Sequence, residues 1–173
     1  SMTALAEVAV QCALQRLSRW QEAIYGTPIG ASGNRQELIV VGMGKLGGGE
    51  LNVSSDIDLI FAFEEDGETS PNQNGSEKPL SNIDFFTRLS KKLVAAIDEI
   101  TEDGFVFRVD MRLRPYGSEG SLACSFAMLE EYYQNQGREW ERYAWIKGRV
   151  IAGPGKNLEE LLRPFIFRKY LDY

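Results

Sequence analysis

Three aspartates of this sequence have the spacing of a metal-binding site. Asp56 and Asp58 are separated by one residue, so on a strand both occupy the same face. Asp110 lies within a second predicted strand, between Arg108 and Arg112. If the two strands are neighbours, the carboxylates converge and could hold two divalent ions about 3.5–4 Å apart, as phosphoryl or nucleotidyl transfer requires. Two other interpretations stay open: an exposed aspartate pair can be solvated, and Asp110 can form an ion pair with a neighbouring arginine.

A glycine-rich segment directly precedes the aspartate pair. Residues 42–47 form a G-x-G-x-x-G pattern after a predicted strand, which is typical of dinucleotide-binding sites. Consecutive glycines at 47–49 disfavour that interpretation, because a helix should be established there. The segment could instead bind a phosphate through backbone N–H groups, with Lys45 adding a cation, or it could be a plain tight turn. Arg112 and Arg114 are further candidates for holding phosphates.

The composition narrows the chemistry further. The 173 residues include no histidine, which removes histidine general bases, Ser-His-Asp triads and zinc sites built on imidazole. Cys12 and Cys124 lie far apart in the sequence, which disfavours a disulfide framework or a cysteine-rich metal site. A bound metal would therefore have oxygen ligands, as Mg²⁺ or Mn²⁺ does.

The net charge and the hydropathy pattern disfavour two classes of partner, nucleic acids and membranes. With 25 acidic and 19 basic residues, the net charge of −6 disfavours broad binding to nucleic acid. No apolar run approaches the ~20 residues of a membrane span. We therefore expect a cytoplasmic protein with neither a nucleic acid nor a membrane as its partner.

The elements that position the aspartates follow from periodicity and turn signals. Helical spacing of apolar residues predicts helices over residues 3–25, 82–101, 125–136 and 138–152, with Ser81 as the N-cap of the second. Strands are predicted over residues 37–43, 56–63 and 105–114, and a surface loop over 64–79. This order predicts an α/β (α+β) fold with a small mixed sheet and appended helices.

We expect residues 1–35 to form an N-terminal helix and linker, residues 36–153 the core with appended helices, and residues 154–173 a truncated helical segment of a larger protein. Aromatic residues in the predicted helices are interpreted as core packing rather than as stacking partners for adenine: Tyr132, Tyr133, Trp140, Tyr143 and Trp145. Four glutamates are expected on a solvated face, paired with Arg138 and Arg142: Glu130, Glu131, Glu139 and Glu141.

Three motifs together resemble a known family. Residues 41–52 read VGMGKLGGGELN, residues 54–60 read SSDIDLI, and residues 108–115 read RVDMRLRP. They resemble the nucleotidyltransferase superfamily and, more specifically, the bifunctional glutamine synthetase adenylyltransferase/adenylyl-removing enzymes, over about residues 37–152. The resemblance implies the nucleotidyltransferase fold, with Asp56, Asp58 and Asp110 as metal ligands. It also implies a phosphate-binding turn formed by Gly44, Gly47, Gly48 and Ser55.

The resemblance also implies an activity. Enzymes of this family have two related halves: one attaches AMP from ATP to a tyrosine of glutamine synthetase, and the other removes it by phosphorolysis, releasing ADP. Residues 108–112 and 132–143 look more like the adenylyl-removing half. The expected partners are adenylylated glutamine synthetase, ADP or ATP, phosphate and, through the full-length enzyme, the PII signalling protein. The alternatives are the adenylyl-attaching half, a non-catalytic docking module with this fold and, more distantly, a dinucleotide-binding oxidoreductase.

Overall fold

Helices and short strands follow one another along the chain. A computed structural model describes residues 2–43, 56–71, 78–101, 108–110 and 113–167. The helices are α1 (Met2–Tyr25), α3 (Asn82–Thr101), the 3-10 helix η1 (Gly117–Glu119), α4 (Phe126–Asn135), α5 (Glu139–Ile146) and α6 (Lys156–Ile166). The strands are β1 (Thr27–Gly30), β2 (Ile39–Met43), β3 (Asp56–Phe63), β4 (Gly67–Ser70), β5 (Arg108–Asp110), β6 (Ala123–Ser125) and β7 (Arg149–Ala152).

The main sheet is organised around β3. On one side β3 pairs antiparallel with β2, which pairs antiparallel with β7. On its other side β3 pairs in parallel with two short strands in succession, β5 along residues 56–58 and β6 along residues 61–63. The sheet is therefore mixed, which confirms the predicted α/β class with flanking helices.

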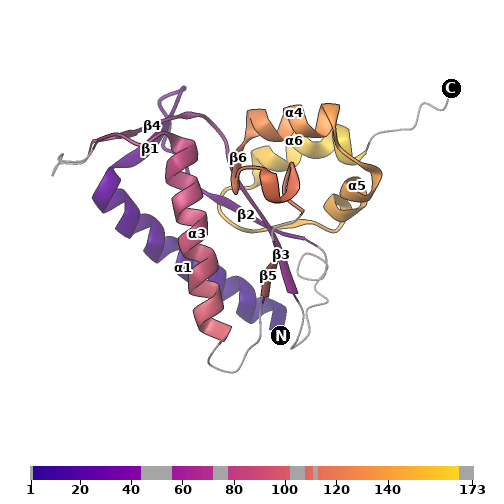
Figure 1. Cartoon of the computed structure of the whole chain (residues 1–173), viewed down its shortest axis with the longest axis horizontal. Helices are drawn as coiled ribbons and strands as arrows, with labels where there is room; N and C mark the ends of the chain where they lie inside the picture. Colours follow the sequence, from indigo (N-terminus) through magenta and orange to yellow (C-terminus); the bar gives the residue numbers. More distant parts are fainter. Residues whose placement is uncertain (1, 44–55, 72–77, 102–107, 111–112, 168–173) are drawn as a thin grey trace.

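Helices cover both faces of this sheet (Figure 1). On one face Leu59, Phe61 and Phe63 pack into a cluster with apolar side chains of α1 and α3. On the other face Ile60 and Ala62 pack into a second cluster with side chains of α4, α5 and α6. This alternation follows from the two-residue period of a strand and explains why β3 reads as a nearly continuous apolar run.

The longest elements agree with the sequence predictions. The predicted helices over residues 3–25 and 82–101 are present as α1 and α3, and the strand over residues 56–63 is present as β3. Ser81 caps α3 as expected, since its Oγ accepts a hydrogen bond of 3.2 Å from the backbone N–H of Asp84. No helix among the described residues has the length and apolar composition to cross a membrane.

The predicted helix over residues 138–152 is wrong in its second half. Helix α5 ends at Ile146, and Arg149–Ala152 instead forms β7 at the edge of the sheet. The chain turns at Gly148, where an added Cβ would lie 2.9 Å from Met43 Sδ. A helix continued past this point would carry side chains into β2, and the β-branched Val150 and Ile151 favour the strand.

Three more short strands differ from the sequence prediction. β1 and β4 form a separate antiparallel pair, although the sequence predicts a linker and a surface loop for their residues. β6 directly precedes α4, where the sequence predicts no strand. β1, β4 and β6 have only three or four residues each, too few for a periodic signal. The predicted strand over residues 105–114 does not reach its expected end, because Leu113 lies in a turn.

Candidate functional site

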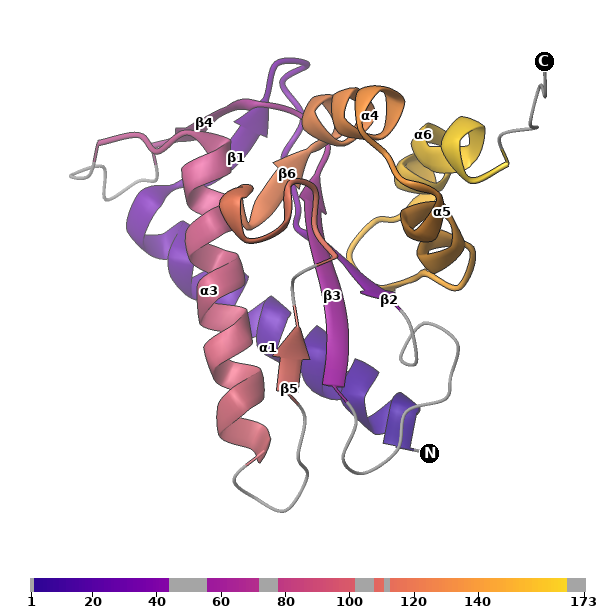
Figure 2. The ribbon, with the colours of Figure 1, turned by 45° about the vertical axis from the view of Figure 1, so that its right-hand side comes forward.

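Strand pairing brings the aspartate positions together. β3 and β5 run in parallel with Asp56 opposite Arg108 and Asp58 opposite Asp110 (Figure 2). The two strands are therefore neighbours, as the predicted site required. Because alternate residues of a strand share a face and residues opposite each other in register share a face, positions 56, 58 and 110 all belong to one face of the sheet.

This face is the one that the C-terminal helices cover. Ile60 and Ala62, the next alternate residues of β3, are buried in the cluster with α4, α5 and α6. Asp58 is half-buried, and its partner in β2 is Met43, which is 1% exposed. The same face of β3 thus changes from carboxylate positions at the start of the strand to a buried apolar core further along it.

The described residues on either side of the glycine-rich segment lie at the same edge of the sheet. β2 and β3 are antiparallel, and Met43 lies opposite Asp58, so the residues flanking the segment are close together. Several predicted site residues lie outside the described residues, and their roles stay predictions: Gly44, Lys45, Gly47, Gly48, Ser55 and Arg112. The structure describes the backbone of Asp56 and Asp110 but not their side chains.

Arg114 lies in the turn that follows β5. Its Nε donates to the carbonyl of Gly120 at 3.4 Å, and its Nη2 donates to that of Ser118 at 3.3 Å. It also lines a cavity of about 370 Å³ together with Tyr116, Arg138 and other residues of the C-terminal half. Its guanidinium thus supports the turn, and its predicted phosphate contact stays a prediction.

The donor chemistry of the three aspartates suits a divalent cation. Carboxylate oxygens are the ligands that Mg²⁺ and Mn²⁺ prefer, and the strand register places three such residues side by side. Among the side chains that the structure describes, no group of three acidic, cysteine or histidine residues is arranged to hold a metal ion. Asp56 and Asp110 are not among those side chains, so the predicted metal site stays a prediction.

Glu141 contradicts the expected solvated face. It is 3% exposed, and its Oε1 accepts hydrogen bonds from the Tyr132 hydroxyl at 2.8 Å and from the backbone N–H of Arg138 at 3.2 Å. Burial raises the pKa of Glu141 above its usual value. Burial, followed by the bond to Glu141, raises the pKa of Tyr132 to about 12. The overlooked signal is helical spacing, because Glu141 lies four residues before the buried Trp145 on one helix face.

The expected pairing does hold for Glu139, which forms an ion pair with Arg142 at 2.6 Å.

The aromatic residues of this region divide into two groups. Tyr132, Tyr133 and Trp145 are buried in the cluster under α4, α5 and α6, which confirms the core-packing interpretation for them. Trp140 and Tyr143 are 48% and 57% exposed, so that interpretation is wrong for these two. The sequence predicts one helix over residues 138–152, whereas α5 ends at Ile146. The side of α5 that faces solvent therefore could not be identified from the longer predicted helix.

Comparison with known proteins agrees with the motifs. Residues 1–163 match the sequence model of the family described as glutamate-ammonia ligase adenylyltransferase. The chain is 58% identical over its whole length to a bifunctional glutamine synthetase adenylyltransferase/adenylyl-removing enzyme of Aromatoleum aromaticum, of which it covers 18%. It is 57% identical to proteins of the same description from Ralstonia nicotianae and Pseudomonas aeruginosa, with 100% and 99% of the chain matched, and 19% and 18% of those proteins covered. The chain thus spans less than a fifth of the length of these curated relatives. On these matches, the chain belongs to the glutamate-ammonia ligase adenylyltransferase family.

Proposed function

We propose that this chain is a catalytic core that removes AMP from adenylylated glutamine synthetase by metal-dependent phosphorolysis, releasing ADP. The observation that carries the proposal is the parallel register of β3 and β5, which sets Asp58 opposite Asp110 with Asp56 on the same face. The described activity of the relatives suggests the substrate, and the motif at residues 132–143 favours the removing over the attaching activity.

Asp56, Asp58 and Asp110 would hold Mg²⁺ or Mn²⁺. When bound, the metal would offset the negative charge of the reacting phosphate and of the departing tyrosine oxygen. This help suits the reaction because the phenol has a pKa of about 10 and is a poor leaving group on its own.

The remaining chemistry is positioning, which needs no histidine. A phosphate oxygen attacks the α-phosphorus of adenylyl-tyrosine, a new P–O bond forms, and the bond to the tyrosine oxygen breaks with its electron pair on that oxygen. A proton from the phosphate ends on the phenolate, which leaves ADP and an unmodified tyrosine. Backbone N–H groups of the glycine-rich segment, with Lys45 and Arg112, would bind the phosphates beside the aspartates.

The test measures ADP release from adenylylated glutamine synthetase and phosphate, with added Mn²⁺. Asp58→Asn should reduce the rate at least about a hundredfold, because it removes one charged ligand of the metal site and disturbs positioning. Asp66→Asn makes the same chemical change at an exposed position outside the site and should retain the wild-type rate. Undiminished release by a folded Asp58→Asn variant would refute the role of this residue.

A second measurement separates metal binding from turnover. Mn²⁺ should raise the melting temperature of the wild-type chain and of Asp66→Asn, because a ligand that binds only the folded state stabilises it by about 2.7 kcal/mol at a hundred times its Kd. Asp58→Asn should lose most of that shift. Turnover of ATP with unmodified glutamine synthetase, but not of phosphate with the adenylylated form, would assign the chain to the attaching activity instead.

A further inference from the structure

Helix α5 presents an apolar side to solvent. Trp140, Tyr143 and Ile146 are 48%, 57% and 56% exposed, and their three-residue spacing places them on one side of the helix. The opposite side, with Glu141 and Trp145, is buried. Single exposed apolar residues are ordinary, but a tryptophan, a tyrosine and an isoleucine together on an eight-residue helix form a patch of the kind found at interfaces. We call these three residues, with Lys147 at the end of the helix, the α5 face.

Two exposed cations flank the α5 face in an otherwise acidic protein. The chain carries a net charge of −6, yet Glu139 is paired with Arg142 and Glu141 is buried against Tyr132. Exposed cations lie at both ends of the helix, Arg138 before it and Lys147 after it. Cations at both ends of an exposed aromatic surface suit a partner segment that carries acidic side chains.

The C-terminal end of the α5 face adjoins the end of the sheet at which positions 56, 58 and 110 lie, which we call the aspartate edge. The helix leads through Gly148 into β7, and an added Cβ at Gly148 would lie 2.9 Å from Met43 Sδ. Met43 is the strand partner of Asp58 and belongs to the same face of the sheet. In Figure 2, α5 lies beside the end of β2 at which Met43 is found. A partner bound to α5 would therefore reach the proposed catalytic edge without crossing the sheet.

The N-terminal end of the α5 face opens into a hollow. The cavity of about 370 Å³ beside Trp140 is lined by Tyr116, Arg138 and Glu141 among others. Tyr116 is 43% exposed, and its ring packs edge-on against the ring of Tyr132, with 4.7 Å between the two ring centroids. Such a hollow next to an exposed tryptophan can receive a side chain of a bound protein.

We propose that the α5 face docks the protein substrate, namely the segment of adenylylated glutamine synthetase around its modified tyrosine. The proposal rests on the proposed function, because it assumes that this substrate is the one that reaches the aspartate edge. One observation selects this occupant: the face is continuous, through Gly148 and Met43, with the edge that the modified tyrosine must reach, so a segment that carries this tyrosine can lie on the face while the tyrosine is at the aspartates.

The test compares two substrates, adenylylated glutamine synthetase and free O-adenylyl-tyrosine, which has no protein segment to dock. The measured quantity is the ratio of kcat/KM for the first to kcat/KM for the second. Trp140→Ala should lower this ratio at least about tenfold through a higher KM, as truncation of an interface hot spot does. Tyr143→Ala provides an independent second variant should Trp140→Ala fail to fold.

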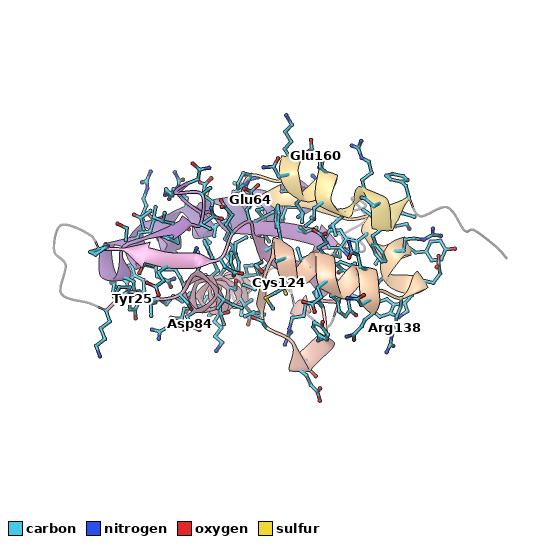
Figure 3. All side chains as sticks on the ribbon, turned by 90° about the horizontal axis from the view of Figure 1, so that it is seen from above. Tyr25, Glu64, Asp84, Cys124, Arg138 and Glu160 are labelled. Carbon is cyan, nitrogen blue, oxygen red and sulfur yellow. The ribbon has the colours of Figure 1, made fainter. Side chains whose placement is uncertain are left out.

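Trp20→Ala is the matched control. Trp20 is a tryptophan of similar exposure, 53%, on α1, which covers the other face of the sheet. Tyr25, near Trp20 on α1, and Arg138, just before α5, lie at opposite ends of the molecule (Figure 3). The ratio should stay within about twofold of wild type in Trp20→Ala, since exposed residues outside an interface contribute little. Equal ratios for folded Trp140→Ala, Tyr143→Ala and Trp20→Ala would overturn the proposal.

Direct binding keeps this proposal separable from the proposed function. If the wild-type chain releases no ADP from either substrate, the proposed function has failed, and docking is judged by calorimetric titration of adenylylated glutamine synthetase. Weaker binding of Trp140→Ala than of Trp20→Ala would support docking, whereas equal binding or no binding would overturn it. A dimer of the chain in sedimentation that Trp140→Ala dissociates would also overturn it, because a second copy would then occupy the face.

Discussion

Gly148→Ala provides a quantitative test of how α5 packs against the aspartate edge. A Cβ at this position would lie 2.9 Å from Met43 Sδ and 3.2 Å from the carbonyl oxygen of Trp145. Ordinary contacts between carbon-sized atoms are about 3.5–4.0 Å, so Met43 would have to move by up to about 1 Å. Met43, the last residue of β2, is buried in the same cluster as Trp145 of α5, and overpacking of this kind costs about 1–3 kcal/mol. We therefore expect Gly148→Ala to lower the free energy of unfolding by that amount.

A double-mutant cycle identifies Met43 as the cause. Met43→Ala alone should cost about 2–5 kcal/mol, because it leaves a cavity in the core. The double variant should be more stable than the sum of the single effects by at least about 1 kcal/mol, since the clashing sulfur is then gone. Urea unfolding followed by tryptophan fluorescence reports these values, with the buried Trp145 close to the change.

The control for this cycle is Gly33→Ala. Gly33 has a φ of +89° with nothing within 4 Å of an added Cβ, so only backbone strain of about 1–2 kcal/mol is expected. That cost should add to the cost of Met43→Ala without coupling. Strict additivity for Gly148→Ala as well would refute the packing argument, because the clash would then not involve Met43.

Two further predictions concern buried ionisable groups. The raised pKa of Glu141 means that the folded state favours the protonated acid, so its stabilising contribution is full below the unfolded pKa and is lost as the pH rises through the folded one. Glu141→Gln, which cannot ionise but can still accept the hydrogen bond of Tyr132, should therefore gain stability relative to wild type as the pH rises above the usual glutamate pKa of about 4.3 in urea titrations, and a difference independent of pH would contradict this. For the thiols, burial raises the pKa of Cys124 to about 11, whereas Cys12 is exposed. A disulfide reagent at about pH 8 should label Cys12 alone in the folded chain and both thiols in urea, and rapid labelling of Cys124 without urea would show that the core opens locally.

Local sequence signals predicted the long elements because each carries its own evidence. α3 has a serine cap and twenty residues of helical periodicity, and β3 has eight residues, of which six are apolar and two are the aspartates. The aspartate positions followed from the same local rule, since alternate residues of a strand share a face. Whether Asp110 lies beside the other two aspartates could not be predicted from local signals, because it depends on the pairing of β5 with β3.

The elements that local signals could not predict depend on pairing across the chain. β7 has four residues and is stable as a strand because it pairs with the buried β2, with Val41 opposite Val150. β5 and β6 occupy successive stretches of one edge of β3, so two three-residue segments act as a single interrupted strand. β5 lies within the strand predicted over residues 105–114, whereas β6, with three residues, is too short to show a period. The sequence alone could predict neither pairing, because register depends on which residues of β3 are buried.

The aspartate edge is also the place where the sequence departs from the ordinary rules of sheet pairing. Like charges opposite each other on neighbouring strands are destabilising, yet Asp58 faces Asp110 in register and Asp56 follows on the same face. Two residues further along β3 the same face is fully apolar, with Ile60 1% exposed, so an apolar residue at position 58 would extend the core at no electrostatic cost. Departures from local consistency of this kind concentrate at functional sites, where a ligand offsets their cost. A bound divalent cation would reduce the repulsion between carboxylates at these positions, which links their register to the proposed chemistry.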